Sequence, residues 1–278
     1  MATTTSAQLP VAAAGRVPSS AGKANFAGAL RSEFTKIRSV RSTYWTLLCL
    51  VVVTVGFGAL ASWGVATHGH PGPGFDATAQ SLGGLYISQL IIGVLGVLVI
   101  SSEYSSGMIR TTLTTFPHRG TLIAAKAVVF ALVAFVTGLI TCFASFFIGQ
   151  AFMSSRHLSV TLSDPHVLRA VIGGALFLTA CGLLAFGIGL LLRHSAGAIS
   201  TVVGLLFVLT ILVNFLPQSW QNHLDKWMPA DAGTQIWSTV ANHGQPPVFA
   251  PWTGFAVLCA YAAIALIAGL ALFQKRDA

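Results

Sequence analysis

Charged side chains are scarce in this sequence. Only 8% of its 278 residues are Asp, Glu, Lys or Arg, against roughly a quarter in ordinary soluble domains. Hydrophobic residues make up 54%, and the mean hydropathy is +0.77. So few charges cannot cover the surface of a soluble fold of this length, so we exclude a soluble globular protein.

Proline is absent from the long apolar runs, although the sequence contains eleven prolines. The runs are residues 45–66, 82–101, 121–149, 167–192, 196–216 and 252–273. Each is long enough to cross about 30 Å of hydrocarbon as a helix. Because proline breaks helices, its confinement to the connections supports these boundaries. The pattern predicts an all-α integral membrane protein with six transmembrane helices.

Acidic residues are few as well, seven in all, and none lies near the middle of an apolar run. Gln89 and Asn214 are the most polar side chains within the runs. Carriers driven by protons or sodium usually keep Asp, Glu or His at membrane depth, so an ion-coupled carrier is disfavoured. The sequence also lacks G-x-x-x-x-G-K-[ST], H-E-x-x-H and G-x-S-x-G. We therefore expect no catalytic residue, and ATP would have to be hydrolysed by a separate subunit.

The four cysteines, Cys49, Cys142, Cys181 and Cys259, lie inside apolar runs at irregular spacing. This is the behaviour of small hydrophobic residues, and it indicates neither disulfides nor a metal site. His68 and His70 are close enough to share an ion, but no set of carboxylates or thiolates accompanies them. We expect no metal site and no cofactor bound by this chain.

The residues before the first run divide into two parts. Residues 1–23 are rich in Ala, Thr, Ser, Pro and Gly, which predicts a disordered tail. Phe26, Leu30, Phe34 and Ile37 then recur at helical spacing, which predicts a helix lying in the membrane surface. Glu33 falls within or beside this apolar stripe, so a solvated linker is the alternative.

The basic residues are distributed unequally between the two sides of the membrane. Six spans place both termini on one side, and of the fifteen Lys and Arg residues only Arg156, Arg169 and Lys226 fall on the other. Positively charged loops stay in the cytoplasm, so both termini are predicted to be cytoplasmic. The net charge of +8 therefore reflects membrane topology, and no nucleic-acid partner is expected.

The connection between the second and third runs carries a recognisable pattern. Residues 101–126 read SSEYSSGMIRTTLTTFPHRGTLIAAK. Glu103 at the membrane exit, Gly107, the Ile109–Arg110 pair and Lys126 at the next run resemble the cytosolic signature of permease subunits of type-2 ABC exporters. Residues 32–45 resemble the interfacial connecting helix of that family, and residues 273–278 resemble its C-terminal ending.

The resemblance implies that this connection forms a coupling helix in a groove of an ATPase subunit. Met108, Ile109 and Leu113 would supply an apolar contact, Glu103 and Arg110 a polar rim, and Gly107 a bend. Four threonines among residues 111–115 are mediocre helix formers, so the helix should be short. An ordinary cytoplasmic loop is the alternative.

The connection of residues 217–251 is too long for a passive turn. Trp220, Leu224, Trp227 and Met228 share one helical face, and a second short helix, capped by Asp231, would carry Ile236, Trp237 and Val240. The pattern predicts an external amphipathic hairpin at the outer interface, and the resemblance implies a re-entrant hairpin at this place. A surface loop held by three tryptophans is the alternative.

The resemblance covers residues 24–278 and implies a six-span permease domain in a bacterial plasma membrane. It also implies that the chain pairs with a second permease, the same or homologous, and with two copies of an ABC ATPase that bind ATP and Mg²⁺. Alternating access driven by the ATPases would then export a substrate. A membrane scaffold or sensor-associated subunit that transports nothing is the alternative.

Overall fold

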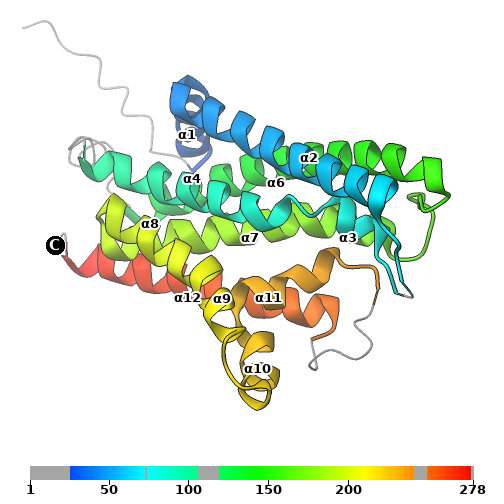
Figure 1. The fold of residues 1–278 in the computed structure, drawn as a ribbon. Coiled ribbons are helices and arrows are strands. Elements are labelled where there is room, and N and C mark those ends of the chain that lie inside the picture. Colours follow the sequence, from blue (N-terminus) through cyan, green and yellow to red (C-terminus); the bar gives the residue numbers. More distant parts are fainter. Residues whose placement is uncertain (1–25, 73, 106–118, 241–248, 277–278) are drawn as a thin grey trace, which may run out of the picture.

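The computed structural model describes residues 26–72, 74–105, 119–240 and 249–276 (Figure 1). These residues form helices and connections, with no strand among them. Six of the helical segments are long and apolar enough to cross a membrane. The predicted fold class, an all-α protein with six spans, is confirmed.

The six spans follow the apolar runs closely. They are α2 (Arg41–His68), α4 (Leu85–Ser105), α6 (Arg119–Met153), α7 (Val167–Leu192), a composite fifth span, and α12 (Pro251–Arg276). The fifth span consists of α8 (Ser195–Val203), the π-helical turn η2 (Gly204–Val208) and α9 (Leu209–Val213).

The shorter elements lie before and between the spans. They are α1 (Phe26–Ser39), α3 (Ala77–Ser81), η1 (Ser154–Arg156), α10 (Gln218–Leu224), η3 (Asp225–Trp227), α11 (Pro229–Thr234) and η4 (Gln235–Trp237). The connection between the first two spans thus contains the helix α3.

Helix α7 forms the centre of the bundle and is the most buried of the six spans. It packs against α4, α6 and α12 (Figure 1). Close approach depends on its small residues: a Cβ at Gly182 would lie 2.9 Å from the Phe130 ring, and one at Gly187 would lie 2.7 Å from the backbone of Ala265. Small residues that admit a neighbouring helix are typical of membrane bundles.

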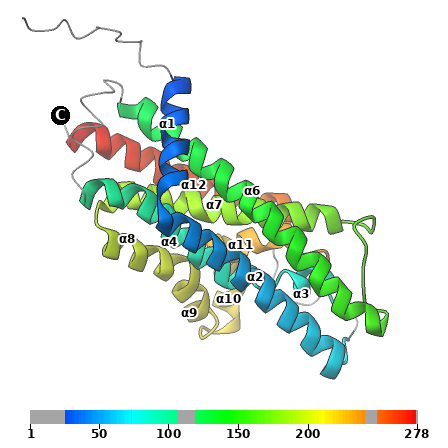
Figure 2. The ribbon, with the colours of Figure 1, turned by 90° about the horizontal axis from the view of Figure 1, so that it is seen from above.

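One end of the bundle gathers several segments that are distant in sequence. Figures 1 and 2 show α1, the last turn of α4, the first turns of α6, the turn between α7 and α8, and the end of α12 at this end. We call it the α1 end. The last turn of α4 and the first turns of α6, which precede and follow residues 106–118, thus lie at the same end.

Two breaks in the helices shape the α1 end. Val40 has extended backbone angles, φ −83° and ψ 112°, so α1 and α2 run in different directions (Figure 2). Arg193, with φ 55°, lets the chain reverse between α7 and α8. The short separation of the fourth and fifth runs is therefore a genuine turn.

Helix α6 is longer than the apolar run that predicted it. Its 35 residues span about 52 Å at 1.5 Å per residue, against about 30 Å for the hydrocarbon layer. Helix α6 therefore extends beyond the membrane, and its first two turns lie beside α1 at the α1 end.

Candidate functional site

A buried ion cluster joins α1 to α6 at the α1 end. The Lys126 Nζ donates to Glu33 Oε2 at 2.5 Å, and the Lys36 Nζ donates to Glu33 Oε1 at 2.8 Å. The side chains of Glu33 and Lys126 are only 1% and 4% exposed. Burial alone would raise the pKa of the Glu33 carboxyl, but the adjacent ammonium groups hold that pKa below its usual value. Glu33 is therefore the carboxylate that fixes α1 against the bundle.

A pocket of about 440 Å³ opens beside this cluster. It lies among α1, α2, α4 and α6, and both lysines and Glu33 line it. Hydroxyl groups and apolar side chains complete its walls: Ile37, Ser39, Val40, Ser42, Thr43, Thr46, Leu95, Leu98, Val99 and Ser102. The pocket combines charged, hydroxyl and hydrocarbon surfaces, which suits an amphipathic ligand.

Most of the predicted coupling residues lie outside the described part of the chain. These are Gly107, Met108, Ile109, Arg110 and Leu113. Glu103 lies in the last turn of α4. The coupling role therefore stays a prediction, and the structure adds only that α4 and α6 flank the segment.

The predicted interfacial residues lie on a helix, α1, whose faces differ. Phe26 and Phe34 are exposed, and Leu30 and Ile37 are partly buried. The face that contacts the protein is instead marked by Ala29 and Glu33. Only part of the predicted apolar stripe is therefore exposed, its interfacial role stays a prediction, and Glu33 points into the bundle.

A seam of hydroxyl and amide groups crosses the helices near the other end of the bundle. The Thr54 and Ser88 hydroxyls are 2.5 Å apart. The Ser145 hydroxyl donates to the Ser81 carbonyl at 2.6 Å, and the Gln150 amide donates to the Ser81 hydroxyl at 2.9 Å. These contacts join α2 to α4 and the short helix α3 to α6, and Gln80 in α3 also donates to the Ala61 carbonyl of α2.

The polar seam was missed by reasoning from the apolar runs, yet the sequence carries a signal for it. On α2 the buried residues recur every fourth position as Leu50, Thr54, Gly58, Ser62 and Ala66. On α6 the seam follows Ser145 and Gly149, also four apart. Small and hydroxyl residues at this spacing predict a close helix contact.

The described part of the connection predicted to be external forms the short helices α10 and α11, each continued by a 3-10 turn. Trp220 and Trp227 are 61% and 51% exposed, and Leu224 is partly buried beside them. Trp237 differs from the expectation, because it is 2% exposed and its ring contacts Tyr86 and Phe177. Trp237 therefore belongs to the protein core, whereas Trp220 and Trp227 remain available to an interface.

Asp231 does not cap the second helix as expected. Helix α11 begins at Pro229, and Asp231 lies in its first turn. The Asp231 Oδ2 is buried and has no hydrogen-bond partner among the described residues. Burial, together with the charge of Asp225, raises the pKa of Asp231 to about 6, and the nearby Thr210 hydroxyl opposes this rise. Asp231 therefore changes charge near neutral pH.

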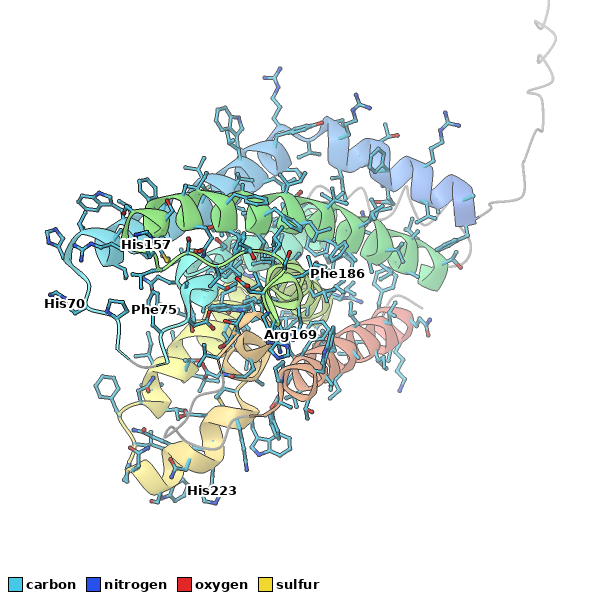
Figure 3. All side chains as sticks on the ribbon, turned by 90° about the vertical axis from the view of Figure 1, so that its right-hand side faces the viewer. His70, Phe75, His157, Arg169, Phe186 and His223 are labelled. Carbon is cyan, nitrogen blue, oxygen red and sulfur yellow. The ribbon has the colours of Figure 1, made fainter. Side chains whose placement is uncertain are left out.

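The Asp76 carboxylate holds the part of this connection that follows η4. Its carboxylate accepts from the backbone N–H of Thr239 at 2.5 Å and from the Thr239 hydroxyl at 2.7 Å, and it also caps α3 by accepting from Ala79 N. Arg169 donates to the Ser238 carbonyl at 2.7 Å. Figure 3 shows Arg169 over the middle of the bundle, and His70 and His223 at its periphery.

The comparisons with known proteins give one result. Residues 19–278 match the family described as ABC-2 family transporter protein. No curated protein matches the chain significantly. The match covers every described helix, including α1 and the connection after α4.

Proposed function

Since the chain belongs to the ABC-2 family of transporter proteins, we propose that it is the permease of an ATP-driven exporter coupled to a separate ATPase. Membership makes it a multi-pass membrane component of an ABC transporter and not itself the ATPase. The proposal adds the export direction, the route of coupling and the assembly. Two ATPase subunits would bind ATP and Mg²⁺, and this chain would bind neither.

The observation that carries the coupling proposal is the buried link between α6 and α1. Residues 106–118 lead directly into α6 at Arg119, and Lys126 lies two turns further along the same helix. A helix transmits displacement along its axis, so force on the connection would move Lys126 and, through Glu33, α1. Helix α6 also packs on α2 and α7, so the same movement would reach the centre of the bundle.

We place the α1 end in the bacterial cytoplasm. The Lys and Arg residues concentrate in α1, in the start of α2 and in the connections at this end, and this bias favours a cytoplasmic location. A single cysteine at Ser106, in a background without Cys49, Cys142, Cys181 and Cys259, tests the orientation. We expect protection from membrane-impermeant maleimides in intact cells, and external labelling would contradict the proposal.

A second permease subunit, the same or homologous, would complete the substrate pathway. Within the described residues the polar seam is filled by contacts between its own side chains, and α7 fills the centre of the bundle. These features favour a pathway between two permeases over one through a single chain. The external hairpin, with Trp220 and Trp227 exposed, would rest in the outer interface.

The test of coupling uses Ile109. If Met108, Ile109 and Leu113 contact an ATPase groove, Ile109→Asp buries an unpaired carboxylate there, which costs several kcal/mol. We expect a protein that inserts normally but loses its copurified ATPase and ATP-dependent transport. Ile109→Leu is the matched control and should retain both. Normal ATPase recovery and transport with Ile109→Asp would overturn the coupling-helix assignment and favour an ordinary cytoplasmic loop.

A further inference from the structure

The pocket at the α1 end changes character with depth. Ser102, near the end of α4, and Ser42, near the start of α2, form its outer part, and Leu95, Leu98 and Val99 form its inner part. Leu95 precedes Ser102 by two helical turns, which places it about 10 Å deeper in the bundle. The pocket is therefore polar at its rim and apolar at its base.

The pocket lies at the depth where a membrane changes from headgroups to hydrocarbon. Its α2 residues are Ser42, Thr43 and Thr46. Tyr44 and Trp45, which lie between Thr43 and Thr46 in the sequence, are exposed. Exposed Tyr and Trp near the end of a span mark the headgroup level. The rim of the pocket therefore faces headgroups, and its base lies at the level of acyl chains.

The charges around the pocket favour an anionic ligand. Lys36 and Lys126 outnumber Glu33 on its walls. Arg38 and Arg41 are exposed, and each is next in sequence to residues that line the pocket. Glu33 is the one acidic residue of α1 and α2 together, so the surroundings of the pocket are strongly basic.

We propose that this pocket binds an anionic phospholipid from the leaflet at the α1 end. The phosphate would lie near the Lys36 ammonium and the Ser42 hydroxyl, and an acyl chain would follow Leu95 and Val99. Basic pockets between spans are known to accept anionic headgroups, and the apolar base distinguishes a lipid from free phosphate. The bound lipid would join α1 to α4, beside the contact between α1 and α6.

Native mass spectrometry of the full chain, purified in detergent and depleted of lipid, tests the proposal. We expect the wild-type protein to retain phosphatidylglycerol in preference to phosphatidylcholine of the same chains. Lys36→Gln removes a charge and should weaken retention about fivefold. Arg31→Gln removes the same charge from α1 outside the pocket, and it should change retention less than twofold.

Filling the base of the pocket without changing charge is the second arm. Val99→Trp should reduce phosphatidylglycerol binding at least as much as Lys36→Gln, and Leu98→Phe is a milder filling variant if Val99→Trp elutes as an aggregate. Equal retention by wild type and both filling variants would overturn the pocket assignment. Displacement of phosphatidylglycerol by millimolar inorganic phosphate would show an anion site without a lipid. Equal binding of phosphatidylcholine would also contradict the proposal.

Discussion

Replacing Glu33 by Gln should detach α1 from the bundle. The variant keeps the shape of the side chain but removes the negative charge that Lys36 and Lys126 share. Glu33 and Lys126 are almost completely buried, so solvent screens the loss little. Taking one partner from a buried ion pair costs about 3–5 kcal/mol.

The lower end of that range applies here, because Lys36 and Lys126 have further interactions. Helix α1 lies at the edge of the bundle, so the cost should appear as local opening of α1 and not as global unfolding. A cost of about 3 kcal/mol raises the open population roughly a hundredfold. Hydrogen–deuterium exchange of residues 26–39, in detergent or nanodiscs, measures this quantity directly.

Two further variants make this result specific. Glu33→Leu combined with Lys126→Met replaces the pair by apolar groups of similar size, and it should restore most of the protection of α1. Lys36→Met alone should cost at most about 1 kcal/mol, because the Lys36 side chain is partly exposed and water screens its charge. Unchanged exchange of α1 in Glu33→Gln would refute the reasoning.

Three other predictions follow from the rest of the molecule. Gly58→Ala should destabilise the protein by about 1–3 kcal/mol, because a Cβ there would overlap the Ser81 carbonyl, whereas Gly56→Ala, with no atom within 4 Å, should be neutral in thermal unfolding. Asp231→Asn should stabilise the protein at pH 7.5 by up to about 3 kcal/mol. Because the pKa of Asp231 is raised from 3.8 to about 6, the penalty on the wild type grows as pH rises between these two values and is complete above 6, so most of the gain should be lost by pH 4; an equal gain at both pH values would contradict it. Replacing Trp220 and Trp227 together by Asp should impair transport in vesicles while membrane insertion stays normal; unchanged transport would leave only a passive loop.

The sequence was most informative where one physical rule acts along the chain. A bilayer requires about 20 consecutive apolar residues per crossing, so the runs predicted each span to within a few residues at most ends. This rule did not determine the turn at Arg193, since only three residues separate the fourth and fifth runs; the left-handed backbone of Arg193 produces it. The polar stripe on α2, from Thr54 through Gly58 to Ser62, also follows a regular spacing and was readable in principle.

The tertiary structure decided which polar residues meet. In the sequence Glu33 interrupts an apolar stripe, and in the structure it lies beside Lys126, which is 93 residues away. Asp76 likewise accepts from Thr239, 163 residues later, and Trp237 enters the core because Tyr86 and Phe177 surround it. Hydropathy along one helix indicates whether a face is apolar, but it does not indicate which helix covers that face. The spans were therefore determined by the sequence alone, and the contacts between them by the packing of the bundle.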